Sequence, residues 1–335
     1  MKKHANIPIF IPHLGCPNQC VFCNQHTISG VESFEPESVV DIIEEALATI
    51  GDKEAEIAFF GGSFTGIDRD LMIRLLEIAN GYLTLGKVSA IRCSTRPDYI
   101  DDEILDILKK YGVKVIELGL QSTSPDVLLK TKRGHDFSAE ERACRMIVES
   151  GFSLIGQMMI GLPASSMESE IETAKFIISS GAVGARIYPT VVFKETELCD
   201  MAITGKYKPL SLESAVSRSA AVMKLFIENG VEVIRVGLCS SDNLSGEDTY
   251  FAGPNHPAIG ELVENELYYK LIYDELSSIK TENTNINVFV PRGALSKAIG
   301  QKKKNKLRLI NDFKLSDIKF TEREDIPEYC VTIER

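Results

Sequence analysis

Three cysteines lie within eight residues near the start of the chain, in the segment CPNQCVFC. Cys16, Cys20 and Cys23 have the spacing C-x3-C-x2-C, and no fourth cysteine or pair of histidines follows nearby. Structural zinc prefers four protein ligands, so a zinc site here would have to recruit His13 or His26. Three thiolates can instead anchor three corners of a [4Fe-4S] cluster and leave one iron free to bind another molecule. The spacing therefore favours an iron–sulfur site with one open iron.

Composition indicates a globular protein in a reducing compartment. The 335 residues are 44% hydrophobic, which is enough for one large core and a second, smaller unit. The opening segment MKKHANIPIFIPHL is interrupted by prolines, and no other apolar run approaches membrane-spanning length. We therefore expect a cytoplasmic protein without membrane contact, in which clustered thiols are metal ligands or catalysts. The remaining cysteines are scattered and are expected to be small buried hydrophobes: Cys93, Cys144, Cys199, Cys239 and Cys330.

Short β-branched runs alternate with amphipathic helical stretches along the first 240 residues. Six runs are candidate strands: IPIFI (7–11), EIAFF (56–60), VSAIRC (88–93), KVIELG (114–119), LIGQMMI (154–160) and GARIY (184–188). Ser165 with Glu168 predicts a capping box before the helix EIETAKFI. The alternation predicts an α/β fold of parallel strands with right-handed crossovers, as an open sheet or a partial barrel. In both cases functional groups collect at the carboxyl ends of the strands.

Five segments at or near these strand ends carry candidate ligand groups. They are GGSF, CSTRPD, ELGLQS, KRGH and IGLP. Glycines let the backbone approach a ligand closely, and Arg133 in KRGH can hold a carboxylate through two hydrogen bonds. Each segment also has a structural explanation: Asp98 can belong to a turn and helix cap, and Glu117 can be a buried carboxylate neutralised by an arginine. Their common position favours one pocket.

The cysteine spacing, with aromatic Phe22 before the last cysteine, resembles the signature of the radical S-adenosylmethionine (SAM) superfamily. The resemblance implies that the three cysteines ligate a [4Fe-4S] cluster, that its free iron binds SAM, and that one electron cleaves SAM to a 5'-deoxyadenosyl radical. GGSF resembles the GGE-type motif that binds the methionyl amine of SAM, with Ser63 in place of the usual acid. The residues implied to contact SAM are Phe22, Gly61, Gly62, Ser63, Ser94, Gln121 and Arg133, and Tyr188 is implied to lie in the catalytic pocket.

A more specific resemblance, over roughly residues 7–237, is to the radical SAM domain of the catalytic subunit of Elongator. It is carried by STRPDYI, IELGLQS, KRGH, IGLP and RIYPTVVFKETELCDMAITGKYKPLS (186–211). It implies a partial (βα)6 barrel of the TIM type over residues 1–240 and modification of a wobble uridine in tRNA. The chain departs from that family in two respects. About a hundred residues follow the barrel, too few for the family's acetyltransferase domain, and Ser94 stands where the family more often has glutamate.

The end of the chain predicts a small α+β unit over residues 285–335, joined by a loop and a linker helix over residues 241–284. Its order of strand, helix, basic loop, helix and strand resembles the RNA-binding K-homology (KH) module. In SKAIGQKKKN, Gly300 matches the first glycine of the module's phosphate-clamping loop, and a lysine replaces the second. The resemblance implies RNA contacts by Lys302, Lys303, Lys304 and Lys306, and an ordinary solvated basic helix face is the alternative.

Net charge is unevenly distributed. The chain carries −11 overall, whereas the segment from Lys297 to Arg308 holds six cations and no acid, which leaves −17 on the remainder. This pattern indicates a local contact with a polyanion. The sequence therefore predicts a radical SAM transferase that modifies a base in tRNA or rRNA and receives its electron from a donor such as flavodoxin or ferredoxin. Two alternatives stay open: radical SAM chemistry on a small molecule or tetrapyrrole, and a zinc-stabilised RNA-binding protein.

Overall fold

The structure is a computed structural model that describes residues 4–11, 14–16, 20–24, 27–28, 34–51, 54–238 and 249–335. His13, His26 and Cys239, named above, lie outside the described residues. No helix in these ranges is long and apolar enough to cross a membrane.

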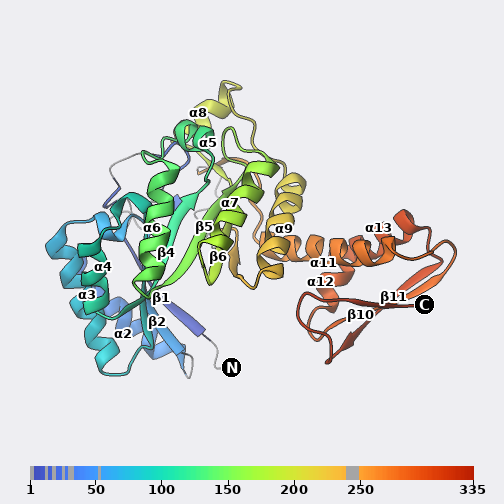
Figure 1. Ribbon diagram of the computed structural model, residues 1–335, viewed down its shortest axis with the longest axis horizontal. Helices are drawn as coiled ribbons and strands as arrows, with labels where there is room; N and C mark the ends of the chain where they lie inside the picture. Colours follow the sequence, from blue (N-terminus) through green and yellow to red (C-terminus); the bar gives the residue numbers. More distant parts are fainter. Residues whose placement is uncertain are drawn as a thin grey trace.

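A seven-stranded parallel sheet forms the larger part of the molecule (Figure 1). Its strands lie in chain order and the sheet curls into a half-barrel, with helices packed along its outside. The strands are β1 (His4–Phe10), β2 (Glu54–Phe60), β3 (Ala90–Thr95), β4 (Val113–Gln121), β5 (Ser153–Ile160), β6 (Gly184–Pro189) and β8 (Glu232–Val236). The longer helices around them are α2 (Val39–Ile50), α3 (Arg69–Thr84), α4 (Asp102–Lys110), α6 (Phe137–Glu149), α7 (Met167–Ser179) and α9 (Leu212–Glu228), and the shorter ones are α5 (Pro125–Lys130) and α8 (Glu197–Ile203).

All six predicted strands are confirmed, and so is the α/β partial barrel. The seventh strand, β8, was not predicted and pairs in parallel with β6 at the edge of the sheet. None of its residues is buried, and no other described strand pairs with its outer edge. EVIRV therefore lacks the buried apolar run that marks the other strands. Within the predicted loop after β8, Tyr250–Ala252 forms β9, which pairs antiparallel with β7 (Val192–Phe193).

The predicted capping box of Ser165 and Glu168 is wrong by one residue. The N-cap of α7 is Ser166, whose hydroxyl accepts from the N–H of Ser169 at 3.2 Å, while the Ser169 hydroxyl accepts from the N–H of Ser166 at 2.9 Å. The Ser165 hydroxyl instead donates to the buried Glu170 at 3.2 Å. The Ser-x-x-Glu pattern fits only the predicted register, but Ser165 is engaged by Glu170 and Ser169 completes the capping box in place of a glutamate.

Charged side chains from several strands meet inside the half-barrel. Glu117 on β4 is fully buried and accepts from Arg186 on β6 at 2.6 and 2.9 Å and from Arg92 on β3 at 3.2 Å. Arg92 also pairs with Glu56 on β2, and Gln157 on β5 donates to Glu117 at 3.0 Å. Because β4 and β6 are not neighbours in the sheet, their contact places this network on the concave face.

The C-terminal unit is a three-stranded sheet with two helices. β10 (Asn285–Pro291) is the central strand, with β11 (Asp317–Arg323) parallel on one side and β12 (Thr332–Glu334) antiparallel on the other. The connection from β10 to β11 contains α12 (Leu295–Ile299) and α13 (Lys304–Phe313). The elements therefore follow the predicted order of strand, helix, basic loop, helix and strand.

Helix α11 (Ile259–Ser277) joins the two parts, and Figure 1 shows it as an orange rod that extends from the half-barrel to the C-terminal unit. Val263 and Leu267 pack in the core of the half-barrel. Ile272 and Leu276 pack in the core of the C-terminal unit. One continuous helix therefore contributes side chains to both cores.

We expect Glu117→Gln to destabilise the fold, because Arg92 and Arg186 would lose their shared anion. Removing one partner of a buried ion pair costs ~3–5 kcal/mol, and the free energy of unfolding in urea should fall by an amount in this range. Glu172→Gln is the control: it removes an exposed partner of Lys175 and should cost less than ~0.5 kcal/mol. Similar small losses in both variants would contradict the structural role of the network.

Candidate functional site

The cysteine loop follows β1 at the carboxyl end of the sheet. Cys20 is buried and the other two thiols are half-buried. The N–H of Val21 donates to the carbonyl of Thr131 at 3.2 Å, and the carbonyl of Val21 accepts from the N–H of Leu198 at 2.8 Å. Phe22 packs against an apolar cluster formed by Val21, Val192, Leu198, Cys199 and Tyr207. The loop is therefore anchored on both sides. Among the described residues, no three histidine, cysteine, aspartate or glutamate side chains lie close enough together to hold a metal ion.

Two buried arginines approach Cys20. Nη1 of Arg133 donates to the Cys20 sulfur at 3.3 Å, and Nη1 of Arg96 lies 3.9 Å from the same atom. Burial raises the pKa of the Cys16 thiol, and the positive charge of Arg96 opposes this rise. Positive charge beside the loop favours thiolates, the form in which cysteine binds metal.

The GGSF loop contacts the cysteine loop through backbone atoms. A Cβ on Gly62 would lie 2.2 Å from the carbonyl oxygen of Leu14. A Cβ on Gly15, whose φ is +73°, would lie 2.2 Å from the carbonyl oxygen of Ser63. The N–H of Ser63 also donates to Leu14 at 3.2 Å. Glycine is required at both positions because a side chain would separate the two loops.

Ser63 and Gly61, both predicted SAM contacts, lie in different environments. Ser63 is fully buried, and its hydroxyl bonds to Thr95 at 2.9 Å and accepts from the N–H of Arg96 at 3.3 Å. This side chain therefore ties the loop after β2 to the end of β3. Gly61 is half-buried and has φ +110°, a conformation that glycine adopts readily. The part of this loop that can approach a ligand is its backbone.

Two buried polar atoms on side chains beside Gly119 have no hydrogen-bond partner among the described residues: Nε of Arg133 and Oε1 of Gln121. Both side chains converge on Gly119, because Arg133 donates to its carbonyl and a Cβ there would lie 3.0 Å from Nε2 of Gln121. Gln121 has φ +71° at an irregularity in the pairing of β4 with β5. A free donor and a free acceptor at one place fit a bound molecule with a carboxylate and amine or hydroxyl groups, such as SAM.

Ser94 and Tyr188 belong to the network inside the half-barrel. The Ser94 hydroxyl accepts from Gln157 at 2.9 Å. Burial acts to lower the pKa of Arg186, but its hydrogen bonds with Glu117 and Tyr188 raise it on balance. The structure confirms that Glu117 is a buried carboxylate neutralised by arginines.

Sequence reasoning missed the partners of Arg96. Asp98 does not cap α4, because Asp101 does so. Burial acts to raise the pKa of Asp98, but hydrogen bonds from His135 and Arg96 lower it well below its usual value. The arginine and aspartate two positions apart in CSTRPD are the only local signal of this pair, since His135 comes from a distant loop.

The predicted RNA-binding lysines lie in the C-terminal unit. Lys302, Lys303 and Lys304 are exposed, and none of them forms an ion pair within the described ranges. Lys302 and Lys303 have φ values of +52° and +62°, so the loop turns sharply before α13. Lys306, by contrast, pairs with Asp317 at 2.9 Å.

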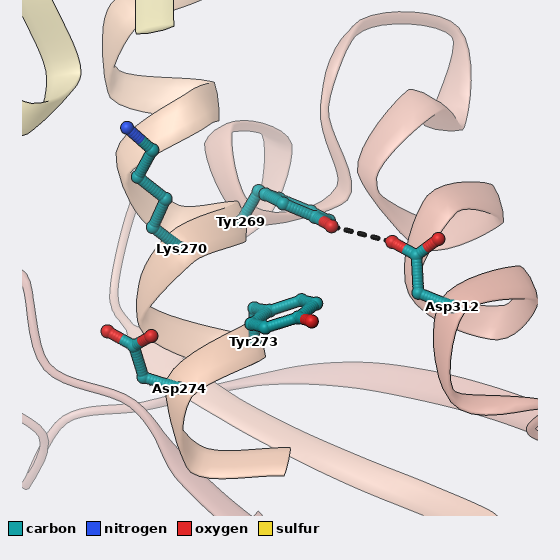
Figure 2. Close-up of a pocket in the computed structure, with 5 residues that line it drawn as sticks. All are labelled: Tyr269, Lys270, Tyr273, Asp274 and Asp312. Carbon is teal, nitrogen blue, oxygen red and sulfur yellow. Dashed lines mark hydrogen bonds between the residues drawn. The ribbon is translucent and has the colours of Figure 1, made fainter. Parts of the chain in front are cut away.

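A pocket of about 510 Å³ lies between α11 and α13 (Figure 2). Figure 2 shows Tyr269 and Tyr273 on α11, with the Tyr269 hydroxyl directed at Asp312, to which it donates at 2.6 Å. Lys270, on the same helix, donates to the carbonyl of Ser217 on α9 at 2.9 Å. Because these polar groups bond to neighbouring elements, we assign the pocket to the junction of α9, α11 and α13 and not to the cysteine site.

A parallel half-barrel with three cysteines after its first strand, and with unpartnered polar atoms among the described residues at its mouth, is the arrangement expected of a radical SAM protein. The sequence profile of the Radical SAM superfamily matches residues 10–177, and that of the Radical_SAM C-terminal domain matches residues 182–269. The chain belongs to the radical SAM superfamily, and its cofactors are a [4Fe-4S] cluster and SAM.

The chain is also similar to several individual proteins. The chain is 27% identical over 256 residues to Elongator complex protein 3 of Saccharomyces cerevisiae, which covers 64% of this chain and 46% of the relative. It is 31% identical over 229 residues to an uncharacterized protein of Methanocaldococcus jannaschii, with 64% and 70% covered. The structure of Methanocaldococcus infernus Elp3 has the same fold, with a TM-score of 0.64 at 23% identity over 82% of this chain and 64% of that chain. The chain thus spans about half the length of the yeast relative.

We expect Gly62→Ala to displace the cysteine loop, because its Cβ would lie 2.2 Å from the Leu14 oxygen. Cluster affinity should fall roughly tenfold, as for other changes to groups that support metal ligands, and iron and sulfide analysis after anaerobic reconstitution measures it. Gly81→Ala in α3 is the control, since its Cβ meets nothing within 4 Å and should leave the cluster content unchanged. Full cluster content in Gly62→Ala would contradict the role of this contact.

Proposed function

We propose that this protein is a radical SAM enzyme that modifies a base in tRNA or rRNA. The observation that carries the RNA assignment is the group of three exposed lysines, free of ion pairs in the described part of the chain, on a unit that α11 joins to the half-barrel. The resemblance to the Elongator catalytic subunit, a family that modifies a wobble uridine in tRNA, supports the same assignment.

In this proposal Cys16, Cys20 and Cys23 ligate the cluster. When bound, the cluster would supply the electron for the cleavage of SAM to a 5'-deoxyadenosyl radical, which would take hydrogen from the substrate. The unpartnered Nε of Arg133 would donate to the SAM carboxylate, and the unpartnered oxygen of Gln121 would accept from an amine or hydroxyl of SAM.

The remaining site residues shape the mouth of the half-barrel. The backbone of Gly61 and Gly62 would lie close to SAM, and Phe22, within the cysteine loop, packs against the apolar cluster that contains Val192 and Leu198. Ser94 and Tyr188 line the polar interior next to the Glu117 network, where a substrate base would enter. Their hydrogen bonds hold them in place before the substrate arrives.

The C-terminal unit acts in this proposal as a KH-like RNA-binding domain. Gly300 packs so closely on Asn305 that an added Cβ would lie 2.9 Å from it, and Asn305 in turn donates to the carbonyls of Asn265 and Ala298. The loop is therefore fixed to α11 and α12, with Lys302 and Lys303 exposed to meet phosphates. The reaction takes place in the cytoplasm with flavodoxin or ferredoxin as the donor.

Cys20→Ala tests the cluster. Wild-type protein purified without air should be brown and release 5'-deoxyadenosine from SAM under reduction, and the variant should lose at least ~99% of this activity, as expected when a ligand of the reacting metal is removed. Cys199→Ala changes a buried cysteine in the apolar cluster under the loop and should keep both properties. Colourless wild-type protein with stoichiometric zinc would instead favour the zinc-stabilised alternative.

Lys302, Lys303 and Lys304 changed together to alanine test the RNA assignment. Three phosphate contacts to single-stranded RNA would contribute about −2 to the slope of log K against log salt, so the variant should bind RNA more weakly and with a shallower salt dependence. Lys109, Lys110 and Lys130, exposed on the half-barrel, changed to alanine give a control with the same loss of charge.

Mass spectrometry of nucleosides from cells with and without the gene then identifies the modified base. If both triple variants bound RNA equally well, the lysines of this loop would not be the RNA-binding residues. An unchanged nucleoside profile would favour a small-molecule substrate.

A further inference from the structure

Two arginines converge on the Cys20 sulfur, Arg96 from the segment after β3 and Arg133 from the loop between α5 and α6. The contacts are 3.3 Å for Arg133 and 3.9 Å for Arg96, and these residues are only 5% and 4% exposed. Guanidinium groups stay charged at any pH at which the protein is folded. Cys20 therefore has a permanent positive environment that is shielded from water.

Arg96 is held in one orientation by its partners. Its Nε and Nη2 each donate at 2.9 Å to one oxygen of Asp98. Nη2 also donates to the carbonyl of Arg133. A two-pronged pair fixes the plane of a guanidinium group, which leaves Nη1 directed at Cys20.

His135 and Glu140 continue this arrangement into α6. Nδ1 of His135 lies 3.3 Å from Nη2 of Arg96 and 3.5 Å from Asp98, and Nε2 lies 3.1 Å from Glu140. Both hydrogens of Nη2 are already directed at Asp98 and the carbonyl of Arg133, so Nδ1 of His135 is assigned as a donor to the carboxylate of Asp98. The side chains of His135 and Glu140 are 1% and 0% exposed. Asp98 is thus the only partly exposed member of a set that otherwise lies inside the protein.

The two arginines lie where they would affect the reduction potential of a cluster bound through Cys20. Reduction adds one negative charge to the cluster, and hydrogen bonds and positive charge at its sulfur ligands stabilise that charge. Loss of one arginine contact would therefore make the cluster harder to reduce. Outer groups of this kind tune metal sites without binding the metal.

We propose that Arg96 is a positioning residue which, held by Asp98 and His135, raises the reduction potential of the cluster bound through Cys20. The inference rests on the proposed ligation of the cluster by Cys20. It goes beyond the SAM contact proposed for Arg133, because it concerns ease of electron entry and not SAM binding.

The test is a redox titration of the reconstituted protein without SAM, followed by electron paramagnetic resonance. Arg96→Gln should lower the midpoint reduction potential of the cluster by ~59 mV, which corresponds to a tenfold change in the one-electron reduction equilibrium. Arg96→Lys keeps the charge and should shift the midpoint less. Arg218→Gln is the matched control and should leave it unchanged, because Arg218 makes a similar two-pronged pair with Glu170 and does not contact Cys20.

Iron and sulfide content, measured first, separates the possible failures. Wild-type protein without a cluster would overturn both the proposed function and this inference. Arg96→Gln with full cluster content and an unchanged midpoint would overturn the inference alone. If Arg96→Gln does not retain the cluster, Arg96→Lys decides: a lowered midpoint supports the role of the guanidinium contact, and an unchanged midpoint overturns it.

Discussion

The position of the candidate site depends on a contact in which two loops meet backbone to backbone. Gly15 and Gly62 leave no room for a side chain between the cysteine loop and the loop after β2. The pairing of β1 with β2 continues directly into this contact, since the N–H of Ile11 donates to Phe60 at 2.7 Å. This contact therefore fixes the position of the cysteine loop relative to the carboxyl ends of the strands, where the other candidate ligand groups lie.

Buried charge is handled differently in the interior and at the mouth of the half-barrel. Inside, Glu117 is surrounded by Arg92, Arg186 and Gln157, so each charge has a counterpart. At the mouth, Arg133 and Gln121 keep buried atoms without partners in the described part of the chain. Leaving a buried polar atom unpaired costs stability, and such atoms are expected where a ligand completes the hydrogen bonding. This contrast separates the structural part of the interior from the binding part.

Much of the fold could be predicted from local patterns, and the contacts of the site could not. The six predicted strands each contain an apolar run with buried residues, whereas no residue of β8 is buried. Ser63 and Lys306 illustrate the second limit, because Thr95 and Asp317, their partners, are far away in the chain. Motif reading identified Arg133 but could not show that it touches Cys20, 113 residues earlier.

Helix α11 has a consequence for how the two parts of the molecule can cooperate. Its nineteen residues form a rod ~28 Å long whose two ends are embedded in different cores. Swivelling of the C-terminal unit would break apolar contacts at one end or the other. A molecule that bound to both parts would therefore meet them at a preset distance and angle, and it would itself have to bend in order to fit.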